Sequence, residues 1–173
     1  TVDPPGWTNN PQPVISFATI DTGSGMDYYE VFIDGGQPVT AESPYTLPVL
    51  DDGIHAVTVC AIDKTGNVRM HTVEVSIDTT PPDDPSFFRL VTGKNHIDLS
   101  WDKPDEDVIY YEIYRLPEWD AGEVITVTGE LHIDSAVDEG VQYVYQLYAV
   151  DRAENRIPGG LLEDGVVSMV IET

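Results

Sequence analysis

The chain has 173 residues, of which 31 are acidic and 8 are basic, and its formal net charge is −23. This length allows one ordinary domain or two small ones. The charge excludes a nucleic-acid binder, which needs clustered Lys and Arg to neutralise phosphates, and disfavours docking on an anionic membrane. A hydrophobic fraction of 41% is too high for a disordered acidic chain, so we expect a folded protein with an acidic surface.

Three further features limit the possible classes of protein. Cys60 is the one cysteine, so the chain has no intramolecular disulfide and no thiolate cluster for structural zinc. No apolar run approaches the ~18 residues of a membrane-spanning helix, which argues against direct membrane insertion. The chain opens on Thr1-Val2-Asp3-Pro4-Pro5 without a signal peptide, so we expect it to be a segment of a longer protein.

Alternation of apolar and polar residues predicts strands from the start of the chain, and helical periodicity is nearly absent. Glycine and aspartate turn signals separate the strands at the spacing of an all-β sandwich. Cys60 alternates out of phase with Val57 and Val59, which places its side chain on the outer face of its strand. The strands predicted in this first part are 14–18, 29–33, 56–61 and 73–77.

The sequence Asp21-Thr22-Gly23-Ser24 follows an apolar stretch and resembles an aspartic-protease motif. That chemistry needs two such aspartates sharing a proton, and no second Asp-Thr-Gly occurs in the chain. We therefore favour a polar loop in which glycine supplies a positive φ.

The four histidines lie at positions 55, 71, 96 and 132, without a pair at metal-ligand spacing on one strand face. His55 shares its strand face with Val57, Val59 and Ala61. A partly buried, hydrogen-bonded histidine is therefore predicted there rather than a metal ligand.

Residues 78–85 form the strongest break in the chain, because Pro81, Pro82 and Pro85 remove backbone donors and fix φ. We predict a short, stiff linker there, with one domain at 1–80 and a second at 81–173. The first part holds 2 basic and 11 acidic residues and the second holds 6 and 20, giving net charges of −9 and −14. Both domains are therefore expected to be acidic.

The second part again shows alternating strands, and its aspartates gather in a loop and at the linker. Asp102, Asp105 and Asp107 lie in one short loop, while Asp83 and Asp84 sit at the domain junction. Calcium takes six to eight oxygen ligands, and either group could supply some of them. Because the EF-hand spacing is missing, we favour solvated turn residues, predict no cofactor, and keep calcium as an alternative. The predicted strands are 97–101, 111–115, 144–149 and 166–171.

Aromatic residues of the second part offer a possible binding surface. Strand alternation places Tyr111 inward and leaves Tyr110 and Tyr114 on the outer face, while Trp119 lies in the long connection 116–137. Stacked aromatic rings bind sugars, so a glycan site is one alternative. Tyrosines on the strands of a sandwich also commonly fill contacts with partner domains.

Three segments of the first part resemble segments of the second part in the same order. Residues 28–31 match 110–113, residues 51–55 match 138–142, and residues 61–67 match 149–155. Such a repeat implies two copies of one topology. The interval is longer in the second copy, which places extra residues in the connection 116–137.

The second part resembles a fibronectin type III domain, through Trp101 in the strand 97–101, Pro104, the strand 111–115, and Tyr143-x-Tyr145-x-Leu147-x-Ala149-x-Asp151. The resemblance implies that Trp101 anchors the core and that the Tyr143 hydroxyl pins a corner by hydrogen bonding to the backbone. The first part resembles bacterial immunoglobulin-like domains. The motifs that carry this second resemblance are Tyr29-x-Val31-x-Ile33-Asp34-Gly35, Ser43-Pro44-Tyr45-x-Leu47 and Asp63-x-x-Gly66-Asn67.

The fold predicted for the whole chain is all-β, with two immunoglobulin-like or fibronectin type III sandwiches in tandem. Both resemblances imply spacing, adhesive or presenting roles rather than catalysis. We therefore predict a non-enzymatic, monomeric pair of modules in an extracellular or surface protein of a prokaryote, with neighbouring domains of the same polypeptide as partners. The alternative is a carbohydrate- or protein-binding module that uses the loops 102–107 and 116–137 or the outer-face tyrosines.

Overall fold

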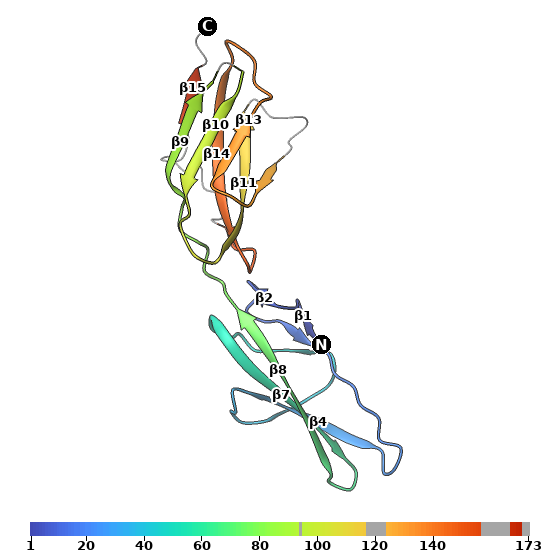
Figure 1. Ribbon diagram of the computed structural model, residues 1–173. Coiled ribbons are helices and arrows are strands. Elements are labelled where there is room, and N and C mark those ends of the chain that lie inside the picture. Colours follow the sequence, from blue (N-terminus) through green and yellow to red (C-terminus); the bar gives the residue numbers. More distant parts are fainter. Residues whose placement is uncertain (94, 117–123, 157–166, 171–173) are drawn as a thin grey trace. The chain divides into compact units, whose positions relative to one another are not determined.

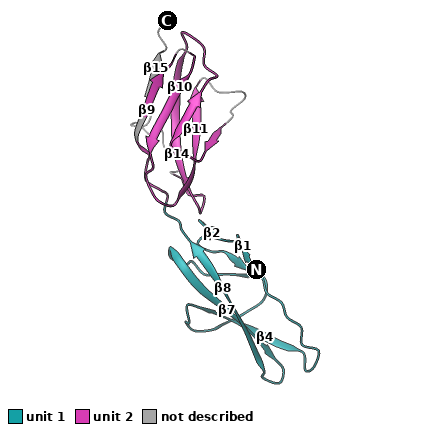
Figure 2. Ribbon diagram, viewed as in Figure 1, with its two compact units in different colours: residues 1–80 teal, residues 81–173 magenta. Residues whose placement is uncertain are grey.

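The computed structural model describes residues 1–93, 95–116, 124–156 and 167–170, and these residues form strands and loops without a helix. The prediction of an all-β fold is therefore confirmed. The chain divides into two compact units, unit 1 at Thr1–Thr80 and unit 2 at Pro81–Thr173 (Figure 2). Among the described residues, no helix is long and apolar enough to cross a membrane.

Unit 1 contains a small sheet of strand order β1-β3-β6 and a larger sheet of order β2-β8-β7-β4-β5 (Figure 1). Apart from the parallel pair β2–β8, neighbouring strands run antiparallel. The strands are β1 (Val2–Asp3), β2 (Trp7–Thr8), β3 (Val14–Ile15), β4 (Met26–Ile33), β5 (Val39–Ala41), β6 (Tyr45–Thr46), β7 (Gly53–Asp63) and β8 (Val68–Ile77).

The small sheet covers only part of the larger one, because its strands are two residues long. The predicted strand 14–18 was too long: β3 ends at Ile15, and the amide of Phe17 donates to the Ser43 hydroxyl instead of a strand. The core therefore lies at one end of the unit. Its buried members are Ile15, Val31, Ala41, Leu47, Leu50, Val57, Val75 and Ile77.

Unit 2 packs two antiparallel sheets of order β13-β10-β9 and β12-β11-β14-β15 (Figure 1). No predicted strand fell in the connection 116–137, but β12 and β13 lie within it and extend one sheet each. The strands are β9 (Ser86–Thr92), β10 (Ile97–Asp102), β11 (Val108–Leu116), β12 (Ile125–Val127), β13 (Leu131–Asp134), β14 (Gln142–Asp151) and β15 (Val167–Val170).

The core of unit 2 is built from inward-facing residues of β10, β11 and β14. Trp101 is buried in it and packs edge-on against Tyr111, with ring centroids 5.1 Å apart. At the corner before β14, the Tyr143 hydroxyl accepts a hydrogen bond from the backbone amide of Asp138 at 2.8 Å. The core role of Trp101 and the corner role of Tyr143, which the resemblance implied, are both seen in the structure.

The two units close the turn after their longest strand in the same way. In unit 1 the Asp63 carboxylate accepts from the amides of Thr65 and Asn67 and from the Asn67 side chain, at 2.7–2.9 Å. In unit 2 Asp151 accepts the same three hydrogen bonds from Ala153 and Asn155. The matched segments 61–67 and 149–155 therefore form the same turn, with the same hydrogen bonds, in both units.

One position of this turn has a positive φ in both units. It is Gly66 in unit 1, with φ 87°, but Glu154 in unit 2, with φ 65°. Glu154→Gly is expected to stabilise unit 2 by about 0.5–1 kcal/mol, since only glycine adopts this conformation without steric cost. Gly66→Ala is the matched control and should destabilise unit 1 to a similar extent. No atom crowds the added Cβ, so the positive φ alone causes this loss. Urea unfolding measures both, and an unchanged Glu154→Gly midpoint would contradict this reasoning.

Cys60 lies on the outer face of β7, as predicted, yet it is only 4% exposed. Glu30 of β4 and Met70 of β8 lie directly opposite it in the sheet. Residues directly opposite one another share a face, so these long side chains flank the thiol. Burial raises the pKa of Cys60, which keeps the thiol protonated and unreactive.

Candidate functional site

The acidic loop 102–107 does not gather its carboxylates in one place. Asp102 and Asp105 are exposed, and the Asp105 carboxylate accepts a hydrogen bond from the amide of Glu106. A carboxylate oxygen of Asp107 lies within 4.8 Å of a carboxylate oxygen of Asp151, a residue that is not part of the loop. Asp83 and Asp84 at the junction are exposed. Calcium binding by these groups stays an alternative that the structure does not test.

The Asp21 motif forms a closed loop rather than a catalytic site. One oxygen of the Asp21 carboxylate accepts from the amide of Gly23, and the other accepts from the Gly25 amide and the Ser24 hydroxyl. These hydrogen bonds lower the pKa of Asp21, so the group is held as a carboxylate by its own loop. The polar-loop interpretation is confirmed, and Gly25 supplies the positive φ.

His55 is partly buried and hydrogen-bonded, as the sequence predicted. Its Nδ1 lies 2.7 Å from the Asp34 carboxylate and its Nε2 lies 2.8 Å from the carbonyl oxygen of Asp51. Both partners only accept, so the ring satisfies both when it carries two protons. The Asp34 and Asp51 contacts raise the pKa of His55, and the hydrogen bond from His55 lowers that of Asp34.

These shifts predict how the stability of unit 1 depends on pH. The contribution of His55 is complete below its unfolded pKa near 6.5 and is lost as the pH rises through its raised folded value. The contribution of Asp34 is complete above its unfolded pKa and is lost as the pH falls through its lowered folded value. The melting temperature of unit 1 should therefore fall on going from pH 6 to pH 9, and His55→Ala should flatten that dependence. An equal fall in both proteins would show that the Asp34–His55 pair does not cause it.

Unit 2 contains an ion pair that is enclosed in its interior. The Arg115 guanidinium donates to Asp134 at 2.8 Å, and the Tyr145 hydroxyl donates to the same carboxylate oxygen at 2.7 Å. Burial raises the pKa of Asp134, but the hydrogen bonds from Tyr145, Ala136 and Arg115 outweigh it and lower the value overall. Asp134 is 2% exposed, so this network holds the fold and cannot meet a ligand.

The outer face of the β11–β14 pair carries aromatic side chains, as predicted. Tyr114 and Tyr148 meet edge-on with ring centroids 5.3 Å apart. The Tyr114 hydroxyl donates to Glu112 and accepts from Arg156, which also pairs with Glu112. We call these four side chains the tyrosine face. Trp119, the other aromatic residue of the binding prediction, lies outside the described residues.

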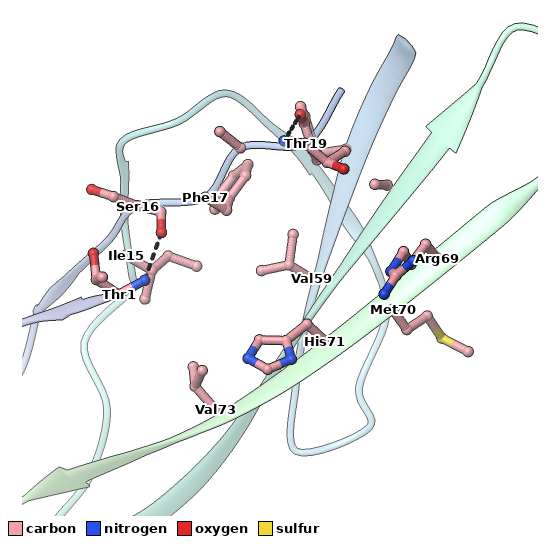
Figure 3. Close-up of a pocket in the computed structure, with 13 residues that line it drawn as sticks. Thr1, Ile15, Ser16, Phe17, Thr19, Val59, Arg69, Met70, His71 and Val73 are labelled. Carbon is pink, nitrogen blue, oxygen red and sulfur yellow. Dashed lines mark hydrogen bonds between the residues drawn. The ribbon is translucent and has the colours of Figure 1, made fainter. Parts of the chain in front are cut away.

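Unit 1 has a groove that sequence reasoning missed (Figure 3). It has a volume of about 390 Å³ and lies between the segment after β3 and the uncovered inner face of the larger sheet. Phe17 and Tyr29 form one wall, with ring centroids 5.0 Å apart, and Arg69 and His71 of β8 form the other. Alternation along β8 does place Arg69 and His71 inward with Val73, which is the signal that could have revealed it.

The exit of the chain from unit 1 is tied to the body of that unit. The Asp52 carboxylate accepts three hydrogen bonds at 2.8 Å, from the Thr79 amide and from the hydroxyls of Thr79 and Thr80. The amide of Asp78 donates to the carbonyl of Thr8. The hydrogen bonds from Thr80 and Thr79 lower the pKa of Asp52, and all of these contacts hold the last residues before Pro81 in place.

Comparison with solved structures identifies the architecture. The chain superimposes on the FN1–FN3 domains of chicken CNTN1 with a TM-score of 0.59 and 15% identity, covering all of this chain and 66% of that one. For the fibronectin(III)-like modules of Clostridium thermocellum CbhA the TM-score is 0.58 at 15% identity. That superposition covers 99% of this chain and 93% of the CbhA chain. This chain is a tandem of fibronectin type III-like sandwiches.

Sequence comparison adds one relative to this fibronectin type III-like chain. No protein-family model matches it. It is 33% identical to an amylopullulanase of Thermoanaerobacterium thermosulfurigenes in an alignment of 104 residues, which covers 54% of this chain and 6% of that enzyme. The likeness supports a module of a multidomain protein.

Proposed function

We propose that this chain is a non-catalytic spacer: two sandwiches that set the distance and angle between neighbouring domains of a larger extracellular protein. The observation that carries the proposal is the clamp of Asp52 on Thr79 and Thr80, which fixes the direction in which the chain leaves unit 1. Pro81 and Pro82 follow directly and restrict the next backbone angles. A junction built in this way has little freedom to bend.

Composition and likeness support the remaining parts of the proposal. A net charge of −23 keeps such a chain soluble and opposes self-association, so it acts as a monomer. Its stability rests on two packed cores rather than disulfides, since Cys60 is free. The resemblance to modules of CbhA and to a segment of an amylopullulanase favours a bacterial secreted or surface protein as the parent.

Small-angle scattering of junction variants tests the spacer function. Asp52→Ala combined with Pro81→Gly and Pro82→Gly should broaden the pair-distance distribution of the chain, because the exit clamp and the restricted angles are both lost. Asp51→Ala is a control of equal size beside the clamp and should leave the distribution as in the wild type. Identical curves for all three proteins would rule out a clamped junction.

A second candidate function is carbohydrate binding by the tyrosine face of unit 2. The paired rings of Tyr114 and Tyr148 and the polar groups of Glu112 and Arg156 offer both stacking and hydrogen bonds. Pullulan and amylose are suitable probes, given the name of the amylopullulanase relative. Retention on these polysaccharides that is lost in Tyr148→Ala and kept in Tyr28→Ala, an exposed tyrosine of unit 1, would establish this function. No retention of the wild type would exclude it for these polysaccharides.

A further inference from the structure

Strand β8 presents a long free edge on unit 1. Strand β7 pairs with β8 along its whole length, from Val68 to Ile77. On the other side, β2 pairs with β8 only at Ser76 and Ile77. Among the described strands none pairs with the edge from Val68 to Val75. The backbone groups of a free edge are a template for another strand.

This edge lacks most of the features that keep sheet edges from pairing. The segment 68–75 contains no proline, glycine or lysine, and its register with β7 has no bulge. Val68 and Met70 are 57% and 67% exposed, so apolar side chains stand beside the free backbone. Proteins usually block such an edge with a charge, a proline or a bulge. Of these features the segment carries only two charges, the inward-facing Arg69 and the exposed Glu74 on the opposite face.

The groove lies directly behind the free edge. In the register of the sheet, Arg69 is opposite Ala61, which is opposite Tyr29, and His71 is opposite Val59. The small Ala61 between two long side chains leaves the hollow that Figure 3 shows between Phe17, Val59, Arg69 and His71. An inward-facing side chain of a strand added to β8 would enter this space.

The charge of the groove suggests what it binds. Arg69 and Lys64 are the basic residues of 1–80, against 11 acidic ones. In the part of the chain that the structure describes, the Arg69 side chain has no hydrogen-bond or ion-pair partner. A guanidinium beside an aromatic, apolar hollow favours a carboxylate next to an apolar group.

From these observations we infer that the β8 edge binds an extended peptide segment of a partner protein as an added strand. The segment carries an acidic and an apolar side chain two residues apart, so that both face inward. The carboxylate pairs with Arg69, and the apolar group fills the groove beside Phe17. A second copy of this chain is disfavoured as the partner, because each copy carries a charge of −23. The inference is independent of the spacer function.

Selection of peptides tests the inference without a known partner. Random octapeptides displayed on phage are selected on the full 173-residue chain. Enriched peptides should contain an acidic and an apolar residue at positions i and i+2. Arg69→Glu should weaken their binding about tenfold or more and, used as the target, should enrich basic residues instead. Arg89→Glu in unit 2 makes the same charge change and should leave binding unaltered.

Backbone methylation of an enriched peptide distinguishes strand addition from simple insertion of a side chain. N-methylation at one set of alternate residues should abolish binding, and methylation at the other set should preserve it, because an added strand donates only every second amide to β8. Failure to enrich any peptide, binding that ignores Arg69, or tolerance of both methylation sets would overturn the inference. If Arg69→Val dimerises while the wild type binds no peptide, Arg69 only keeps the edge unpaired, and the inference is wrong.

Discussion

Asp134→Ala is expected to destabilise unit 2 by about 3–5 kcal/mol, the largest effect of any single change considered for this chain. The substitution leaves the Arg115 guanidinium charged inside the protein, and the Tyr145 hydroxyl loses its acceptor. Hydrogen exchange measured by mass spectrometry reports on each unit separately. Exchange in the strands of unit 2 should accelerate strongly, while peptides of unit 1 exchange as in the wild type.

Two further variants show whether the effect comes from the unpaired charge. Glu139→Ala removes an exposed carboxylate nearby and should change stability by less than about 0.5 kcal/mol. Arg115→Met combined with Asp134→Leu should be more stable than Asp134→Ala, since no charge then remains buried alone. A double variant as unstable as the single one would show that packing, not the ion pair, determines the loss.

Asp151→Ala is expected to destabilise unit 2 by about 2–4 kcal/mol, whereas the equivalent Asp63→Ala should destabilise unit 1 clearly less. Both carboxylates accept the same set of hydrogen bonds from their turn. Asp151, Ala153 and Asn155 are buried, so the amides of Ala153 and Asn155 would lose the carboxylate acceptor without water to replace it. The turn of Asp63 is exposed, and water replaces the lost carboxylate.

Calorimetry of the whole chain separates the two losses as shifts of two unfolding transitions. Asp151→Asn is a conservative control that keeps an oxygen acceptor and should recover part of the loss in unit 2. Equal shifts for Asp63→Ala and Asp151→Ala would contradict the argument, because they would mean that burial of the turn has no effect on its contribution.

The fold could be predicted largely from local patterns. The alternation of apolar and polar residues predicted that the side chains of Tyr111 and Ile113 face inward, and both are buried. The role of Tyr143 depends on one hydroxyl and the backbone a few residues before it, so a short motif was enough to predict it. The strand 14–18 was predicted too long, because alternation cannot show that the Ser43 hydroxyl accepts a hydrogen bond from the amide of Phe17.

Features that depend on contacts distant in sequence were missed. Arg115 continues the inward face of Tyr111 and Ile113, which is a signal of a buried charge. Its partner Asp134 lies in the connection 116–137, where no strand had been predicted. The groove of unit 1 depends on strand register, which sets Arg69 opposite Ala61, and on the short β3 that leaves this row uncovered. Neither the register nor the missing cover can be read from alternation alone.

The distance between the two units in solution tests the spacer function most directly. Spin labels are attached at Thr40→Cys in unit 1 and Glu139→Cys in unit 2, both exposed positions, in a chain that carries Cys60→Ala. Double electron–electron resonance then gives the distribution of the label-to-label distance. The clamped junction at Asp52, Thr79 and Pro81 predicts one narrow peak, which broadens in Asp52→Ala with Pro81→Gly and Pro82→Gly. A broad distribution in the wild-type junction would contradict the proposal that this chain is a stiff spacer.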